Sequence, residues 1–146
     1  MSNGTKVKKR DGRIESLDLD KMHLMVEEAC QGLAGVSASQ VEMKSGIQFY
    51  DGITTSEIQE ILIRSASDLI DLDNPNYQYV AARLLLFALR KQLYGKMREL
   101  PHLEAHILSC TEIDVYDKEI FVKYSKEEID KANSFIDHSR DFKFTY

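Results

Sequence analysis

The sequence predicts a mainly helical α+β fold, in which a small N-terminal β-hairpin caps a bundle of four helices that is followed by a short helical segment. Two observations favour this fold: an Asp-Gly turn between short apolar stretches near the N-terminus, and apolar residues at helical spacing in four later segments. With 146 residues, the chain is long enough for one domain with a short appendage.

Residues 6–17 are expected to form the hairpin, with Asp11-Gly12 as a two-residue loop, because glycine accepts the positive φ of such turns. In that register Lys9 lies opposite Ile14, shares a sheet face with Val7 and points toward the body of the protein, whereas Glu15 points away from Lys9. A shifted register fits the pattern equally well, so the sequence does not decide the register.

The first helix of the bundle is expected to begin at about Asp18 or Asp20 and to end near residue 33, and the second to begin at Ser37 or Ser39 and to end near residue 49. The third and fourth are expected over residues 54–70 and 76–95. Thr54 with Glu57 forms a capping-box pattern at the start of the third helix, and Pro75 suits the first turn of the fourth. The fourth helix is apolar on nearly all sides at its middle, which predicts that it is the central helix of the bundle.

Beyond Gly95 the predicted helices are shorter, and we expect two domains, residues 1–95 and residues 96–146. An amphipathic helix is expected from Pro101 to about Cys110, and another follows the capping-box pattern that begins at residue 125. The chain ends in "DFKFTY", whose alternating aromatic residues resemble a strand without an evident partner.

The composition excludes several classes of protein. The formal net charge of −5 and the pI near 5.4 argue against nonspecific nucleic-acid binding. The N-terminus has no apolar core of a secretory signal, and the most apolar run is too short to cross a bilayer. Two isolated cysteines, Cys30 and Cys110, give neither a disulfide framework nor a zinc spacing. These features predict a reduced cytoplasmic protein without a membrane or nucleic-acid partner.

No metal site or nucleophile is expected from the remaining chemistry. His102 and His106 lie four residues apart on a predicted helix, but no Cys or acidic ligand follows at a familiar spacing. Neither Cys30 nor Cys110 is expected to have a His or a cation beside it that would lower its thiol pKa. No Gly-rich phosphate loop occurs in the sequence either.

Three segments could form the walls of a site for a compact polyanion. The first is the cluster of hairpin cations, Lys6, Lys8, Lys9, Arg10 and Arg13. The second is the start of the third helix, where free backbone N–H groups and three hydroxyls occur in residues 54–56. The third is the pair Phe87 and Lys91, which lie four residues apart on one helical face.

Each wall also has a purely structural interpretation. The hairpin cations alone are more typical of a solvated turn. The start of the third helix is more commonly an ordinary capping box, and Phe87 and Lys91 taken singly are more commonly a core Phe and a Lys whose stem lies along the helix. The three segments therefore support an anion site only if the fold brings them together in one place.

Four segments together closely resemble the N-terminal region of the large subunit of class I ribonucleotide reductase. They are "VKKRDGRIESLDLDKMH", "YDGITTSEIQEILIRSASDLI", "PNYQYVAARLLLFALRKQLYG" and "FIDHSRDFKFTY", and the first three belong to the ATP-cone module of that family. The resemblance implies an allosteric region that binds ATP or dATP, with Mg accompanying the nucleotide. In the family this region controls the oligomeric state of the enzyme and thereby deoxyribonucleotide synthesis for DNA replication.

The resemblance also implies a set of nucleotide-binding residues. The phosphate-binding cations would be Lys9, Arg10 and Lys91, and Thr55 would be the contact at the helix start. The stretch around the adenine and ribose would be Glu15, Ser16, Leu17, Asp18, Leu19, Asp20 and Lys21. The apolar pocket would be Val7, Met22 and Phe87.

The sequence departs from the family pattern at three positions. Family members that are strongly inhibited by dATP often carry histidines at the positions of Gln59 and Ala88. Gln59 is included in the nucleotide-binding set. Position 18 is Asp rather than the Asn that is common in the family. Loss of two imidazole contacts, each worth on the order of 1 kcal/mol, is expected to weaken the distinction between ATP and dATP. One alternative is therefore a degenerate cone that only docks onto another subunit.

The resemblance further implies partners and a missing activity. The expected partners are the remainder of the large subunit, the radical-generating small subunit and further copies of the chain itself. The catalytic cysteines of the reductase have no counterpart in Cys30 or Cys110, so the chain is expected to be inactive alone, as a fragment, a split-gene product or a truncated subunit. A zinc-ribbon regulator would need CxxC pairs, and a small kinase would need a phosphate loop, so both are disfavoured.

Overall fold

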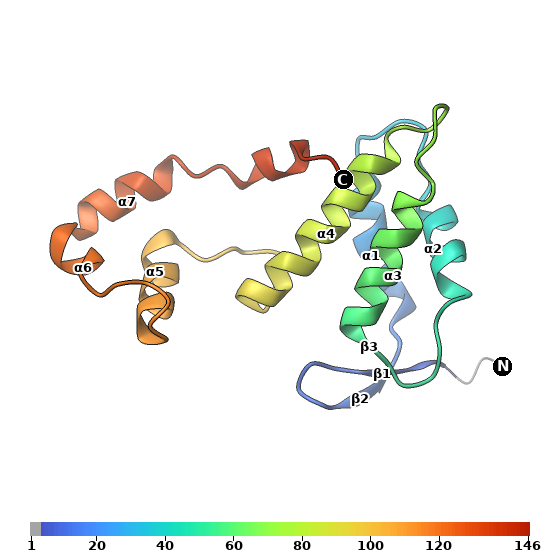
Figure 1. Cartoon of the computed structure of the whole chain (residues 1–146), viewed down its shortest axis with the longest axis horizontal. Helices are drawn as coiled ribbons and strands as arrows, with labels where there is room; N and C mark the ends of the chain where they lie inside the picture. The colour runs from blue at the N-terminus through green and yellow to red at the C-terminus, as the bar shows by residue number, and fades with distance from the viewer. Residues whose placement is uncertain (1–3) are drawn as a thin grey trace. The chain divides into compact units, whose positions relative to one another are not determined.

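The computed structural model describes residues 4–146, which divide into two compact units. One unit runs to Leu89 and includes the C-terminal segment Asp141–Tyr146, and the other is Arg90–Arg140. The fold is α+β and mainly helical, as predicted (Figure 1). The expected domain boundary after residue 95 stays a prediction.

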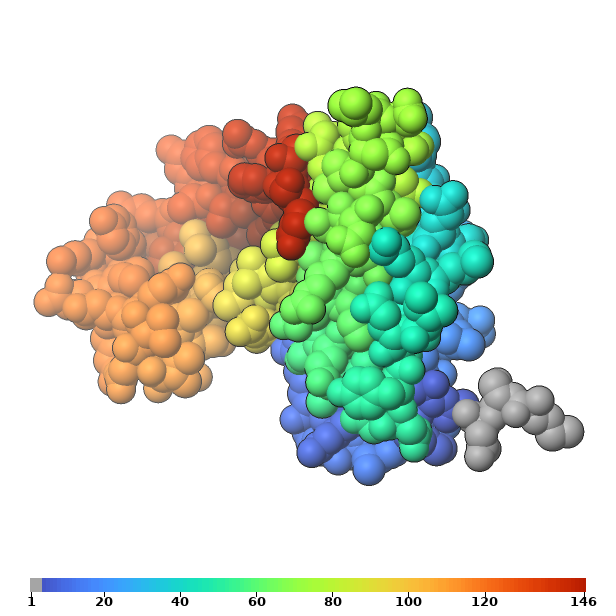
Figure 2. All heavy atoms as spheres, turned by 45° about the vertical axis from the view of Figure 1, so that its right-hand side comes forward, coloured from blue at the N-terminus to red at the C-terminus, as the bar shows by residue number. Residues whose placement is uncertain are grey.

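The first unit contains a three-stranded sheet and the helices of the bundle. Its elements are β1 Lys6–Lys8, β2 Ile14–Ser16, α1 Leu19–Cys30, α2 Ala38–Gly46, β3 Ile53–Thr54, α3 Thr55–Ser67 and most of α4 Tyr77–Tyr94. β1 is the central strand, antiparallel to β2 and parallel to β3. The hairpin lies at the end of the bundle where α3 begins (Figures 1 and 2).

Side-chain caps fix where the first three helices begin. The side chains of Asp18, Ser37 and Thr54 accept hydrogen bonds from backbone N–H groups of the first turns of α1, α2 and α3. Thr54 and Glu57 form the reciprocal capping box that the sequence predicts. The capping residues therefore set the position of each helix start relative to the strand or loop before it.

The core of the first unit lies between the sheet and the inner faces of the helices. Leu62 of α3 and Val80 of α4 are fully buried, as are Val26, Val41 and Ile53 of the neighbouring elements. α4 buries only one face, however, because Leu85 and Leu89 are each 47% exposed. The apolar residues at the middle of α4 are therefore not all buried, and its position as the central helix of the bundle stays a prediction.

The second unit is held by few buried side chains. It contains the end of α4 with α5 Leu103–Glu112, α6 Ile120–Lys123 and α7 Lys126–Ser134. The N–H of Leu103 donates to Asn133 Oδ1 at 2.9 Å, and Ile107 and Ile129 are buried where α5 and α7 pack. The capping box predicted at residue 125 is present at the start of α7.

The C-terminal segment corrects the predicted strand. The 3₁₀ helix η1 spans His138–Lys143, and no strand forms from "DFKFTY" within the described chain. Phe142 packs edge-on against Phe87 with ring centroids 6.2 Å apart, and the Arg83 guanidinium lies 5.3 Å from the centroid of the Phe142 ring. Of the alternating aromatic residues, Phe142 therefore packs onto α4, whereas Phe144 and Tyr146 are largely exposed.

Among the described helices, none combines the length and the apolar character that crossing a membrane requires.

Candidate functional site

The hairpin connection differs by one residue from the predicted turn. The N–H of Gly12 donates to the Lys9 carbonyl at 3.0 Å, and the N–H of Lys9 donates to the Arg13 carbonyl at 2.8 Å. Gly12 has φ of 87°, as expected for this residue, but the connection includes Arg10 as a third residue. Lys8, not Lys9, consequently lies opposite Ile14, so the shifted register is the one formed.

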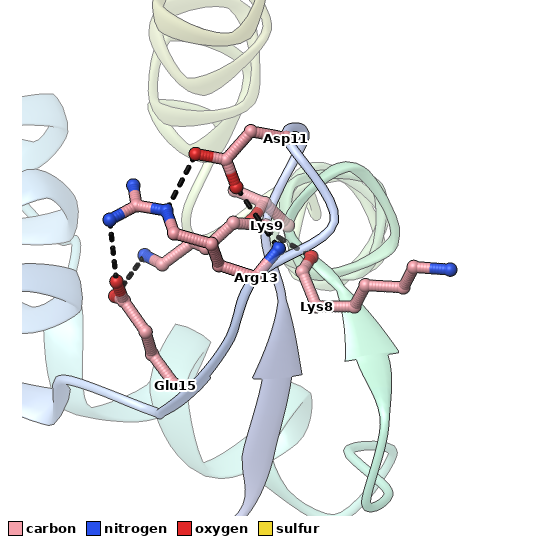
Figure 3. Close-up of polar contacts among 6 residues, drawn as sticks. Lys8, Lys9, Asp11, Arg13 and Glu15 are labelled. Carbon is pink, nitrogen blue, oxygen red and sulfur yellow. Dashed lines mark hydrogen bonds and ion pairs between the residues drawn. The ribbon is translucent and has the colours of Figure 1, made fainter.

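The shifted register brings four charged side chains together on one side of the hairpin. Lys9 Nζ lies 3.6 Å from Glu15 Oε2, and Arg13 Nη1 lies 3.3 Å from Glu15 Oε1. Arg13 Nε also pairs with Asp11 Oδ2 at 2.6 Å. Figure 3 shows these four side chains facing one another, with Lys8 directed away from them. The prediction that Glu15 points away from Lys9 is therefore wrong.

These contacts shift two of the four pKa values. Hydrogen bonds from the backbone and then the side chain of Arg13 lower the pKa of Asp11. The hydrogen bond to Asp11, followed by the charges of Asp11 and Glu15, raises the pKa of Arg13. Both groups are therefore ionised at neutral pH, and the four side chains carry alternating charges.

Two further predicted residues meet the hairpin from α3. Arg10 Nη2 lies 3.4 Å from Gln59 Oε1, and the Thr55 hydroxyl lies 3.5 Å from the carbonyl of Lys8. β3 runs beside β1, with Thr54 opposite Lys8, so α3 begins at the hairpin. The fold thus brings the first two predicted walls of the anion site together.

The start of α3 carries its own negative charge. Glu57 Oε2 accepts hydrogen bonds from the N–H and the hydroxyl of Thr54, each at 2.8 Å, and the Tyr50 hydroxyl donates to Glu57 Oε1 at 2.8 Å. The hydrogen bonds from Thr54, and then the one from Tyr50, lower the pKa of Glu57. This carboxylate completes the capping box that the sequence predicts, and Thr55 is the first residue of the helix.

The run of residues 15–21 leads from β2 into the first turn of α1. Glu15 and Ser16 are in β2, and the N–H of Leu17 donates to the Thr5 carbonyl at 2.8 Å. Asp18 Oδ1 accepts from the N–H of Lys21 at 3.0 Å, which places Leu19 and Asp20 in the first turn. The carboxylate of Asp18 is therefore engaged as a helix cap.

The predicted apolar residues have different environments. Val7 and Phe87 are buried, whereas Met22, in the first turns of α1, is half-buried. Lys91 lies one helical turn beyond Phe87, in the last turn of α4. The convergence of Lys9 and Lys91 on one phosphate group stays a prediction.

The cysteines and histidines supply no metal site within the described part of the chain, where no group of three or more potential ligands occurs. Burial raises the pKa of Cys30 to about 11. Cys110 Sγ, however, lies 3.7 Å from His106 Nε2, so the prediction that no histidine lies beside Cys110 is wrong. The His106 ring also packs edge-on against Tyr94 and Tyr116.

Known sequences provide an independent comparison. Residues 5–92 match the ATP cone domain family. The whole chain is 48% identical to subunit alpha of ribonucleoside-diphosphate reductase 1 of Escherichia coli and 47% identical to the subunit alpha of Haemophilus influenzae. The subunit alpha of Enterobacteria phage T4 is 41% identical over 94% of the chain. The chain spans 18 to 19% of the length of these relatives.

Proposed function

The chain belongs to the ATP-cone family, and we propose that residues 5–92, which match this family, bind ATP or dATP as an allosteric effector. The observation that carries the proposal is the meeting of hairpin and α3, where Arg10 contacts Gln59 and Thr55 contacts the Lys8 carbonyl. Cations, a hydroxyl and a helix N-terminus at one place are the donors that phosphate oxygens require.

In this proposal the phosphates are bound by cations of the hairpin and by the start of α3. Lys9 and Arg10 contact them from the hairpin and Thr55 from α3, and the family resemblance assigns Lys91 to the phosphates as well. Gln59, whose side chain is buried, positions the Arg10 guanidinium through the 3.4 Å contact. Mg accompanies the nucleotide as the counter-ion of the phosphates rather than through a protein cluster.

The nucleoside would lie against residues 15–21 and the apolar residues Val7, Met22 and Phe87. The side chain of Asp18 already accepts the Lys21 N–H, and Leu19 beside it is 61% exposed. Apolar and polar residues thus alternate over residues 17–20, which offers both kinds of contact to an adenine and a ribose. A hydrogen bond to the nucleoside from Asp18 would compete with its role as a cap.

Relatives of the chain are reductase subunits, which supports a role in controlling deoxyribonucleotide synthesis. We propose that nucleotide binding sets the oligomeric state of a ribonucleoside-diphosphate reductase in the cytoplasm. Its partners would be the remainder of the large subunit and the radical-generating small subunit. Light scattering of the complete subunit with and without dATP tests this step, and an unchanged mass would contradict it.

Calorimetric titration with ATP, dATP and GTP tests nucleotide binding itself. Saturable heat is expected with both adenine nucleotides and is expected to be much weaker with GTP. Gln59 and Ala88 favour similar affinities for ATP and dATP, because two imidazole contacts are replaced. If folded protein gives no heat with ATP and none with dATP, the alternative is favoured: a degenerate cone that only docks onto another subunit.

A further inference from the structure

Lys9, a predicted phosphate ligand, already has an anionic partner within the chain. Its ammonium lies 3.6 Å from Glu15 Oε2, and its side chain is only 31% exposed. A phosphate oxygen that binds this ammonium at hydrogen-bonding distance therefore competes with a carboxylate. Nucleotide binding at Lys9 becomes an exchange of one anion for another rather than the filling of a bare cationic site.

Arg13 binds the other oxygen of the same carboxylate. Its Nη1 lies 3.3 Å from Glu15 Oε1, while its Nε is held by Asp11 at 2.6 Å. The planar guanidinium is therefore fixed from both sides, and the charges alternate along the series Asp11, Arg13, Glu15 and Lys9 (Figure 3). Arg13 is not among the residues that the family resemblance assigns to nucleotide binding.

We propose that Glu15 is a built-in competitor of the nucleotide for Lys9, and that Arg13 is a positioning residue that sets the strength of this competition. Two cations share the Glu15 charge, so each weakens the hold of the carboxylate on the other. When Lys9 moves to a phosphate, Arg13 keeps Glu15 paired and reduces its repulsion of the triphosphate. The inference rests on the proposed function.

A double-mutant cycle in the whole chain measures this role. Arg13→Gln is expected to weaken ATP binding by about two- to fivefold, the range of exposed ion pairs, because Lys9 becomes the only cation on Glu15. In a Glu15→Gln background the same change is expected to have a smaller effect, because the competitor is gone and only the charge of Asp11 is left unpaired. Arg13→Lys keeps a charge beside Glu15 and is expected to restore most of the affinity.

The matched control is Arg64→Gln in α3. Arg64 is exposed and pairs with one carboxylate, Glu60, at 3.6 Å, so its removal changes the net charge equally without touching the hairpin. The cycle is repeated with inorganic tripolyphosphate, because Glu15 also belongs to the run assigned to adenine and ribose. Circular dichroism checks folding, which Arg13 is not expected to affect because its side chain is 68% exposed.

The outcomes separate this inference from the proposed function. If the parent chain binds ATP but Arg13→Gln weakens binding equally in both backgrounds, or no more than Arg64→Gln does, the competition is refuted and the site stands. The competition is likewise refuted if the coupling is seen with ATP but vanishes with tripolyphosphate, since the effect then does not pass through a phosphate at Lys9. A parent chain without ATP binding overturns both.

Discussion

Replacing Lys9 by alanine is expected to weaken ATP binding much more than replacing its neighbour Lys8. A hydrogen bond to a charged group contributes about 1.5 to 3 kcal/mol, and the exposed pair that Lys9 gives up with Glu15 offsets about 0.2 to 1 kcal/mol of this. A net effect of about 1.5 kcal/mol corresponds to roughly a tenfold higher Kd. Lys8 points away from the charged cluster in Figure 3, so Lys8→Ala is expected to change Kd by less than about twofold.

Calorimetric titration of the three proteins at one ionic strength gives the comparison, with Lys91→Ala as a fourth protein that is expected to resemble Lys9→Ala. Both hairpin variants lose one positive charge from adjacent positions, so long-range attraction of the nucleotide falls equally in each. Equal Kd values for Lys8→Ala and Lys9→Ala would therefore refute the assignment of hairpin faces. The assignment would also be refuted if Lys8→Ala proved the weaker binder.

Three further predictions concern the framework of the site. Thr54→Ala removes the reciprocal cap of α3 and is expected to lower the free energy of unfolding in urea by about 1 to 2 kcal/mol. Ser37→Ala removes a single hydrogen bond of 3.4 Å and is expected to lower it by about 0.5 kcal/mol. Equal losses for the two variants would contradict this reasoning. The hydrogen bond and charge of Glu42 raise the pKa of His23 in the folded chain. The protonated His23 therefore stabilises the fold fully below its unfolded pKa of about 6.5, and this stabilisation is lost as the pH rises through the higher folded pKa. The melting temperature of the parent should therefore fall more between pH 6 and pH 8 than that of His23→Gln, and parallel profiles would refute this. Because the pKa of Cys30 is raised to about 11, iodoacetamide should alkylate Cys30 slowly at pH 8 in the folded chain, and alkylation as fast as in urea would contradict its burial.

Local signals were sufficient to predict the elements that support the site. Asp18, Ser37 and Thr54 each carry a side-chain oxygen at a helix start, and each caps the helix that the sequence predicts. The capping box of α3 depends on two residues three positions apart, so no long-range information is needed to find it. The buried positions of α3 recur at helical spacing, which is also a local property of the sequence.

The pairing of the strands could not be predicted in the same way. Asp11-Gly12 is compatible with a two- or a three-residue connection, and the choice depends on whether Lys9 pairs with Arg13 or lies opposite Ile14. β3 contains only Ile53–Thr54, too short for a periodic signal, and forms because it lies beside β1. The aromatic alternation at the C-terminus was misleading because Phe142 packs on Phe87, a contact 55 residues away in the sequence.

One residue of register changes the electrostatics of the candidate site. In the two-residue loop Glu15 would face away from Lys9, and the hairpin would present an uncompensated ammonium to any anion. In the observed register Glu15 lies opposite Val7 and meets both Lys9 and Arg13. Two cations are thereby balanced by two carboxylates in a chain whose net charge is −5. On the proposed function, a triphosphate that binds this face must rearrange these ion pairs at short range, and we expect a multivalent anion to offset the loss of Glu15 better than a monovalent one.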